Sequence, residues 1–415
     1  MANSESGRHR VPRINPELRE RESVLPLELF FDLVFVLGFT QCTALMVANP
    51  TFEGVGRGML VLAVLWWAWV GYAWLTSVIN PEEGAVRIAM FGAMAALLIV
   101  ALCVPEAFGD RALAFAVAYG IVRAGQIVLF LLGSREDPRL RHSVWGLAVS
   151  SAIGSGLLVS ASFLDGWAQV ALWGVAILID WGGPALFGVE GWQLVPAHFA
   201  ERHGLVIILA LGESIIALGV AAEVELTTEV IAAGVLGIGL SAALWWTYFD
   251  VVSLVTAVRL IRMPDRKTRN RFARDSYSYL HFPMVAGIVL SALGAEEVLA
   301  HVHEPLDGVH AFALLGGVAI YLLGHVALRL RNAHTLNRQR LALALLLFGL
   351  IPLAMEVSAL ATVIGLDVLM WGMIAYENSR YGEGRYRLRH GEETAVPGAP
   401  PAEDSNEDGG GEDPR

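Results

Sequence analysis

The sequence predicts an all-α membrane protein, a polytopic transmembrane helix bundle of about 12 spans arranged as two parallel six-helix repeats. Three observations lead to this prediction. The 415 residues are 55% hydrophobic and 17% charged, whereas soluble domains have roughly 45–50% apolar and about 25% charged residues. The apolar residues gather in runs of about 20, the length that crosses a bilayer as a helix. The basic residues fall almost entirely between alternate runs, as they do in cytoplasmic loops.

The apolar runs follow one another along the chain. The first comes after a polar N-terminal stretch, is too long for a signal peptide and lacks a small-residue cleavage site, so we interpret it as the first span. The predicted spans cover residues 27–47, 58–79, 86–105, 110–133, 143–163, 167–188, 202–222, 228–260, 277–299, 307–329, 339–354 and 356–377. The eleventh run is short and Pro352 falls near its end, so ten or eleven spans remain an alternative.

The positive charges test this count and orient the chain. If the N-terminus is cytoplasmic, Arg57 and Arg111 lie in outside loops and Arg123 lies within a span, while the rest of the 29 Lys and Arg residues lie in cytoplasmic segments. This asymmetry indicates an even number of spans and two cytoplasmic termini. The most basic loop, residues 259–274, suits anionic lipid head groups and carries no nucleic-acid motif. The lipid bilayer is therefore an expected partner, and nucleic acid is not.

Four segments carry a resemblance to a known family. They are Glu28–Val36 (ELFFDLVFV), Glu201–Ser214 (ERHGLVIILALGES), Leu244–Asp250 (LWWTYFD) and Tyr279–Ile288 (YLHFPMVAGI). In this order they resemble the bacterial low temperature requirement protein A (LtrA) family. The resemblance implies a multi-pass protein of the bacterial inner membrane. It implies neither a substrate nor a reaction.

The two halves of the chain also resemble each other. Trp66–Trp69 (WWAW) in the second span is echoed by Trp245–Tyr248 (WWTY) in the eighth, and weaker echoes keep the same order. Because six is an even number, both halves would enter the membrane from the same side, and a site would lie at their interface near the midplane. We therefore predict a cytoplasmic segment 1–26, a first repeat 27–188, a second repeat 189–377 and a disordered acidic cytoplasmic tail 378–415.

Three ionisable residues lie deepest in the predicted spans, namely Arg123, Asp180 and Glu213. Unpaired charges at that depth are costly, so we expect Arg123 to pair with Asp180, with Glu213 or with both. One interpretation is a central substrate or proton site, in which Glu213 takes up and releases a proton during transport. The other is a static buried ion pair that fixes helix register.

Two carboxylates lie nearer the cytoplasmic end of the first span. Glu28 and Asp32 are four residues apart and share one helix face. A carboxylate in the bilayer costs about 2.5–3.5 kcal/mol on insertion scales, so each needs a partner. The positive end of the helix dipole suffices for Glu28. For Asp32 we expect a pair with His281 or a terminal arginine, or a side chain that reaches cytoplasmic water.

Asp250, His281 and His325 complete the set of candidate site residues. Asp250 and His281 would line a cytoplasmic vestibule together with Asp32. His281 and His325 are candidates for a proton relay, because histidine titrates near neutral pH. The aromatic residues around Asp250 also fit an ordinary interface belt.

Several kinds of site lack their usual patterns. The two cysteines, Cys42 and Cys103, lie in apolar runs without metal-ligand spacing, and no helical His-x-x-x-His pair occurs. The sequence has no nucleotide-binding P-loop, no H-E-x-x-H and no G-x-S-x-G motif. We therefore expect no metal and no cofactor, and the missing catalytic motifs disfavour an enzyme.

These observations predict a secondary, proton-coupled transporter of a small polar or amphipathic molecule. Its partners would be the bilayer, an unknown small-molecule substrate and protons. The alternative is a membrane enzyme or assembly factor that acts on a lipid-linked substrate through Asp32, Asp250, His281 and Arg87. A transporter needs a cavity that reaches the midplane, whereas an enzyme needs an acid and a histidine within hydrogen-bond reach near the cytoplasmic face. A purely structural membrane protein is a third possibility.

Overall fold

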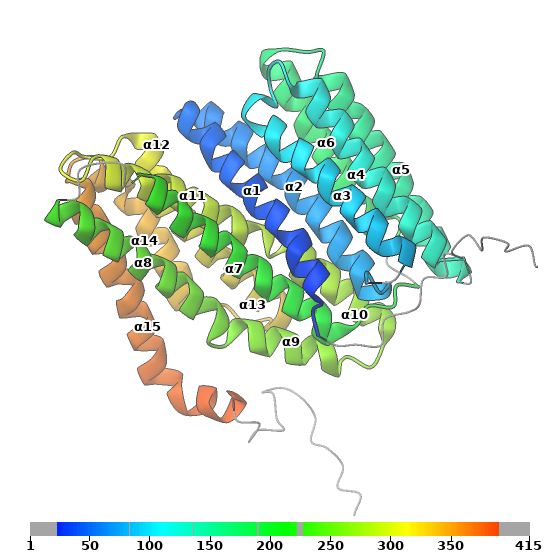
Figure 1. The fold of residues 1–415 in the computed structure, drawn as a ribbon. Helices are drawn as coiled ribbons and strands as arrows, with labels where there is room; N and C mark the ends of the chain where they lie inside the picture. Colours follow the sequence, from blue (N-terminus) through cyan, green and yellow to red (C-terminus); the bar gives the residue numbers. More distant parts are fainter. Residues whose placement is uncertain (1–22, 83, 136, 189–190, 222–226, 390–415) are drawn as a thin grey trace, which may run out of the picture.

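The computed structural model describes residues 23–389 apart from 83, 136, 189–190 and 222–226. The described residues form a bundle of long helices without an extended strand, which confirms the all-α prediction (Figure 1). The predicted N-terminal segment falls almost wholly outside the described residues, and so does most of the predicted acidic tail.

The first half of the chain contributes six long helices whose positions agree with the first six predicted spans. They are α1 (Pro26–Ala48), α2 (Phe52–Val78), α3 (Gly84–Cys103) with a short 3₁₀ turn η1 (Val104–Glu106), α4 (Ala112–Gly133), α5 (Pro138–Ala161) and α6 (Gly166–Leu186). Local sequence marks several starts. The Thr51 hydroxyl accepts from the Gly54 amide at 3.0 Å, and the Asp137 carboxylate caps α5, which begins with Pro138.

The second half is less regular than its hydrophobic pattern predicts. Its elements are α7 (Pro196–Ala221), α8 (Thr228–Phe249), α9 (Val252–Arg262), α10 (Arg266–Phe272), the π-helix η2 (Ala273–Tyr279), α11 (Phe282–Ala300), α12 (Gly308–Ala311), the π-helix η3 (Phe312–Gly316), α13 (Gly317–Ala333), α14 (Arg338–Ala354) and α15 (Ala359–Arg389). The predicted eighth span breaks at Asp250, and two spans contain π turns. Such turns place an extra residue in the helix and frequently occur at functional sites.

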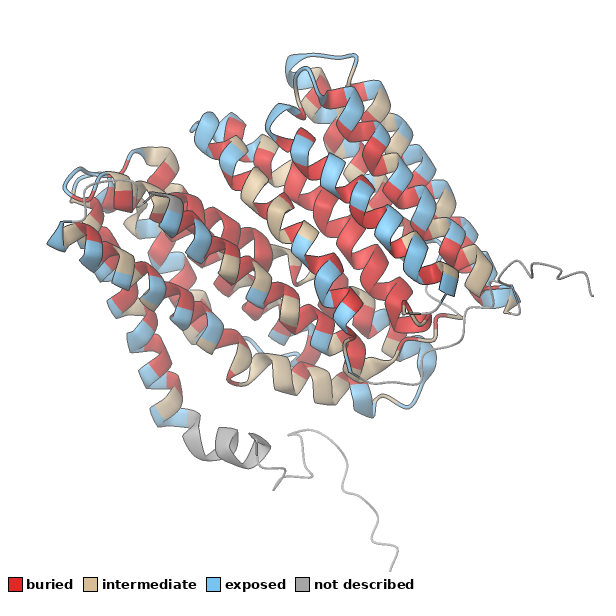
Figure 2. Cartoon of the chain, viewed as in Figure 1, coloured by how far each residue is buried: buried red, intermediate tan, exposed pale blue. Residues whose placement is uncertain are grey.

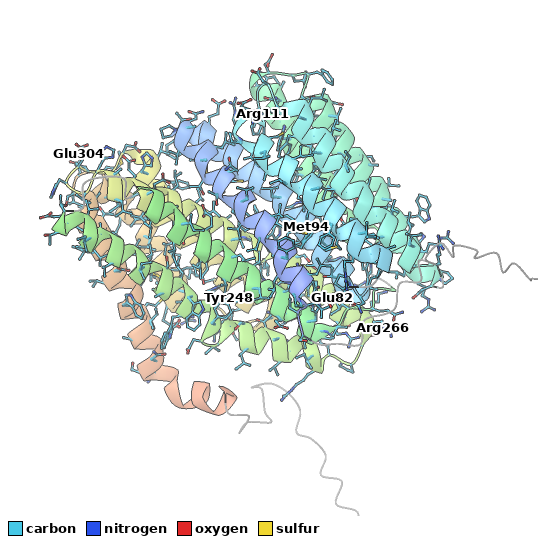
Figure 3. The ribbon with its side chains drawn as sticks, viewed as in Figure 1. Glu82, Met94, Arg111, Tyr248, Arg266 and Glu304 are labelled. Carbon is cyan, nitrogen blue, oxygen red and sulfur yellow. The ribbon has the colours of Figure 1, made fainter. Side chains whose placement is uncertain are left out.

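Eleven helical segments among the described residues are long and apolar enough to cross a membrane. A twelfth crossing depends on α14, whose 17 residues span about 25 Å, slightly less than a hydrocarbon core of about 30 Å. Pro352 lies in its last turn. Figure 3 shows Glu82 and Arg266 at one end of the bundle and Arg111 and Glu304 at the other, as alternating spans require. Which end faces the cytoplasm stays a prediction.

Helix α2 lies at the centre of the bundle. In its most apolar stretch 89% of the residues are buried, against 28% in α6 at the edge. Trp66, Trp69 and Tyr72 on α2 are fully buried, while Trp167 and Leu178 on α6 are exposed. Figure 2 shows the same contrast between a buried interior and an exposed outer face. Large apolar side chains on that outer face suit contact with lipid.

The helices pack in a similar order in the two halves. In the first half α1 packs on α3, α3 on α4, α4 on α5 and α2 on α6. In the second half α7 packs on α11, α11 on α13, α13 on α14 and α8 on α15. This correspondence fits the predicted duplication, which stays a prediction. Helices α1 and α7, the first of each half, also contact each other and join the halves.

Helices α11 and α13 approach so closely that glycine is required at their contact. A Cβ atom on Gly287 would lie 2.5 Å from the carbonyl oxygen of Gly317, and one on Gly317 would lie 2.6 Å from the amide nitrogen of Ser291. Both neighbours are backbone atoms and cannot move aside cheaply. Small residues at such contacts let membrane helices pack closely.

We expect Gly287→Ala to destabilise the protein by about 1–3 kcal/mol, because its methyl group overpacks the α11–α13 contact. The matched control is Gly349→Ala, where a Cβ would meet nothing within 4 Å. There alanine is expected to be neutral or stabilising, since it is the better helix former. Thermal unfolding in detergent measures both variants. Equal unfolding temperatures for the two variants would contradict the close approach.

Candidate functional site

A buried polar network joins α1, α2 and α7 where the two halves meet. We call it the junction network; its members are Glu28, Asp32, Trp69, Thr76, Ser77, His198 and Arg202. Arg202 lies at its centre. Its Nη1 is 3.1 Å from Glu28 Oε1 and its Nη2 is 2.7 Å from Asp32 Oδ1. One guanidinium therefore bridges two carboxylates on successive turns of α1, and all three side chains are fully buried.

The remaining members bind some of the charged atoms. His198 Nε2 lies 2.9 Å from Glu28 Oε1, and its Nδ1 lies 3.1 Å from the Ser77 hydroxyl. Trp69 Nε1 donates to Asp32 Oδ1 at 3.0 Å. Asp32 Oδ2 is buried and has no hydrogen-bond partner within the described part of the chain. Two carboxylates thus face one arginine, and one proton on His198 or on a carboxylate would make the network neutral.

The expected pairing of Asp32 with His281 was wrong, whereas the arginines of the N-terminal segment lie outside the described residues. Among the described residues Asp32 pairs with Arg202 and Trp69 and makes no hydrogen bond with His281. The helix dipole was expected to suffice for Glu28, but this carboxylate also binds Arg202 and His198. Its Oε2 accepts from the Leu25 amide at 2.8 Å, at the start of α1. A sequence signal existed for this pairing: the i,i+4 spacing of His198 and Arg202 on α7 matches that of Glu28 and Asp32 on α1.

Glu213 lies on the same pair of helices but apart from the junction network. Its side chain is fully buried, and Oε1 accepts from the Thr43 hydroxyl of α1 at 3.0 Å. Its second oxygen has no hydrogen-bond partner, and no cation among the described residues forms an ion pair with it. Glu213 is therefore a buried acid at the contact between the halves that has no counter-charge among the described residues.

Arg123 and Asp180 form a separate buried pair within the first half. Arg123 Nη2 lies 2.8 Å from Asp180 Oδ1, which confirms the predicted pairing of these two residues. The Tyr119 hydroxyl donates to Asp180 Oδ2 at 3.1 Å and the Ser151 hydroxyl to Oδ1 at 2.7 Å. The bonds of Arg123 go to Asp180, Ser151 and Gln126. Arg123, Asp180 and Glu213 therefore do not form the single central site that the sequence predicts. Glu213 binds Thr43 of α1 instead of the Arg123–Asp180 pair.

His281 lies beside the junction network, next to the π-helix η2. Its Nδ1 donates to the Ser276 carbonyl at 2.8 Å, and its Nε2 accepts from the Tyr248 hydroxyl at 2.8 Å. The His203 ring lies between the two groups, with its centroid 4.9 Å from that of Trp69 and 5.4 Å from that of His281. A row of buried rings therefore leads from Asp32 to Tyr248.

His325 and Asp250 lie in the second half. His325 Nδ1 is 2.6 Å from Arg340 Nη1, and Arg340 binds both carboxylate oxygens of Glu377, at 3.0 and 2.9 Å. The Tyr248 ring centroid is 6.1 Å from that of His325, so the row of rings continues to this ion pair. Asp250 is buried at the break between α8 and α9, where its amide donates to the Trp246 carbonyl.

The four segments that carry the family resemblance thus meet in one place. Glu28–Val36 and Glu201–Ser214 pair in the junction network, and Tyr248 binds His281. The family described as bacterial low temperature requirement A protein (LtrA) matches residues 23–375. The chain belongs to this family. It is also 28% identical to an uncharacterized protein of Rhizobium meliloti (strain 1021) over 372 residues, which cover 85% of this chain and 90% of that protein. No solved structure matches it.

LtrA membership makes this a multi-pass membrane protein, as its helices indicate. The candidate residues that the sequence interpretation missed are His198, Arg202, His203, Arg340 and Glu377. Arg202 and Arg340 were assigned to the ends of spans, where arginine normally reaches water. Both are buried instead, because a carboxylate on another helix meets each of them. Within the described residues, no three His, Cys, Asp or Glu side chains are placed to hold a metal ion.

Proposed function

We propose that this protein is a secondary transporter, coupled to protons, for a small polar or amphipathic molecule. The observation that carries the proposal is the contact between α1 and α7, where the halves meet. It buries the junction network and, separately, Glu213. Ionisable groups inside a membrane protein are costly and usually mark a pathway for a substrate or a proton. Transporters built from two halves commonly place such sites at the interface.

Glu213 would be the proton-binding residue. Its carboxylate has one hydroxyl partner, one open oxygen and no counter-charge among the described residues. A proton on this carboxylate would remove the buried charge, so its protonation and the packing of the halves are coupled. In this proposal the six-span halves rock against each other, with both termini in the cytoplasm, and the bound proton selects one arrangement.

The junction network would hold the halves together on one side of this motion. Arg202 shares its guanidinium between Glu28 and Asp32, and one Asp32 oxygen has no hydrogen-bond partner in the described part of the chain. Such a shared arginine can exchange partners without leaving a charge wholly unpaired. The His281–Tyr248 hydrogen bond, with the His325 ring beside Tyr248, gives a candidate proton relay.

One observation favours the enzyme alternative. His198 and Glu28 form an acid–histidine pair at 2.9 Å near one end of the bundle. The sequence predicted a different histidine, His281, for an enzyme. Both nitrogens of His281 are already bonded, to Tyr248 and to Ser276. Both Glu28 and His198 are fully buried. A lipid-linked substrate would reach them only if α1, α2 and α7 separated.

We expect Glu213→Gln to abolish substrate-driven proton movement. The experiment uses purified protein in liposomes with an entrapped pH-sensitive dye, and probes that are amino acids, small carboxylates, amines and sugars. Wild type should move protons with at least one class of probe, whereas Glu213→Gln should match empty liposomes. The control is Glu53→Gln, which removes an exposed acid that pairs with Arg57 at 2.6 Å. Proton movement that Glu213→Gln leaves unchanged, or none with any probe, contradicts the proposal.

A further inference from the structure

A small cavity lies between α2, α4, α5 and α6 and reaches the π-helix η2 of the second half. Its volume is about 40 Å³. Aromatic side chains form much of its wall, including those of Trp67, Trp74 and Phe130. Gly71 forms part of the wall on α2, where an added Cβ would lie 2.2 Å from the Gln126 amide nitrogen. Because residue 71 has no side chain, the Gln126 amide can pack against α2 and line the cavity.

The lining side chains offer hydrogen-bond donors without matching acceptors. Four buried N–H groups of lining residues have no partner in the described part of the chain: Trp67 Nε1, Arg123 Nε, Gln126 Nε2 and Trp192 Nε1. The lining acceptors are in use. Gln126 Oε1 accepts from Arg123, and the Ser278 hydroxyl accepts from Trp74 Nε1 at 2.9 Å. Buried donors normally have partners, so four orphans around one cavity point to a missing acceptor.

The charges around the cavity have the matching sign. Arg123 and Arg274 line it, and none of the described lining residues is acidic. Asp180, the partner of Arg123, lies on the far side and lines a separate cavity of about 10 Å³. The Arg123–Asp180 dipole therefore directs its positive end toward the larger cavity. Two contacts hold the Arg274 guanidinium beside the larger cavity. Its Nη2 lies 2.7 Å from Asp275 Oδ1, and its Nη1 donates to the Pro184 carbonyl at 3.1 Å.

We propose that this cavity binds a small carboxylate. A carboxylate offers two charged oxygens to the four orphaned donors, and charge-assisted hydrogen bonds of this kind are the strong ones. One water occupies about 10–15 Å³ of such a volume, so the cavity has room for a group of about three or four heavy atoms. The aromatic walls suit the short alkyl part. That this carboxylate is the transported substrate rests on the proposed function, whereas its binding does not.

The test measures thermal unfolding of the purified full-length protein in detergent with increasing sodium formate or acetate. Sodium chloride at equal ionic strength and neutral acetamide are the comparison probes. A ligand that binds the folded state stabilises it in a saturable way. We expect formate or acetate to raise the unfolding temperature, with little effect of chloride or acetamide. Trp192→Phe removes the indole N–H donor but keeps an aromatic side chain, and should weaken carboxylate binding by about tenfold.

The matched control is Trp181→Phe. Its Nε1 is likewise buried without a partner among the described residues, but Trp181 lines the smaller cavity and not the larger one. This variant should bind acetate as wild type does. Gly71→Ala, whose methyl group would displace the Gln126 amide from the cavity wall, should also weaken binding. The proposal is overturned if formate and acetate give no saturable stabilisation, if chloride acts equally, or if Trp192→Phe binds like wild type. Because no gradient is used, these results are independent of the Glu213 transport assay.

Discussion

Arg202→Met is expected to leave little folded protein in the membrane. The substitution strands Glu28 and Asp32, two fully buried carboxylates whose shared cation is Arg202. Removing one partner of a buried ion pair costs about 3–5 kcal/mol, because the remaining charge stays desolvated. That cost is comparable with the whole stability of many proteins. The measurements are the yield of monodisperse protein after extraction and its unfolding temperature.

Two further variants make this result specific. Arg57→Met breaks an ion pair with Glu53 at the exposed start of α2 and should change stability by only about 0–1 kcal/mol. The triple variant Arg202→Met, Glu28→Gln, Asp32→Asn removes all three charges and should recover most of the lost stability. A single Arg202→Met variant that folds and melts like wild type would show that the junction network does not join the halves.

Asp180→Leu is expected to have the second-largest effect. It leaves Arg123, which is only 1% exposed, without its carboxylate, and it removes the acceptor of the Tyr119 and Ser151 hydroxyls. We expect a loss of about 3–5 kcal/mol, measured as a lower unfolding temperature in detergent. Asp165→Leu is the control on the same helix, since Asp165 is exposed and its side chain makes no capping hydrogen bond.

The double variant Arg123→Met, Asp180→Leu separates a static pair from a functional one. Replacing both charges with apolar side chains is often neutral for stability, so this variant should fold. If it also moves protons with substrate like wild type, the pair only fixes helix register. If it folds but no longer moves protons, the pair belongs to the transport site. Failure of the double variant to regain stability would contradict the pairing as the cause of the Asp180→Leu defect.

The pairing of Arg123 could be predicted because arginine deep in a span must find a buried acid, and Asp180 lies at a similar depth. The partner of Asp32 could not be predicted from depth alone. Several arginines lie near that end of the bundle, and only the packing of α1 against α7 selects Arg202. Glu213 shows the opposite outcome, since the same packing gives it Thr43 and no cation among the described residues.

The sequence by itself determined the helical class, nearly all span positions and the family. These follow from the length of the apolar runs and from the cost of charges in lipid. Only the tertiary structure decided which helix faces meet, where η2 and η3 interrupt the spans, and that the junction network and the donor-lined cavity exist. The physical reason is that lipid tails are as apolar as a protein interior, so hydrophobicity does not distinguish a side chain that faces lipid from one that faces another helix.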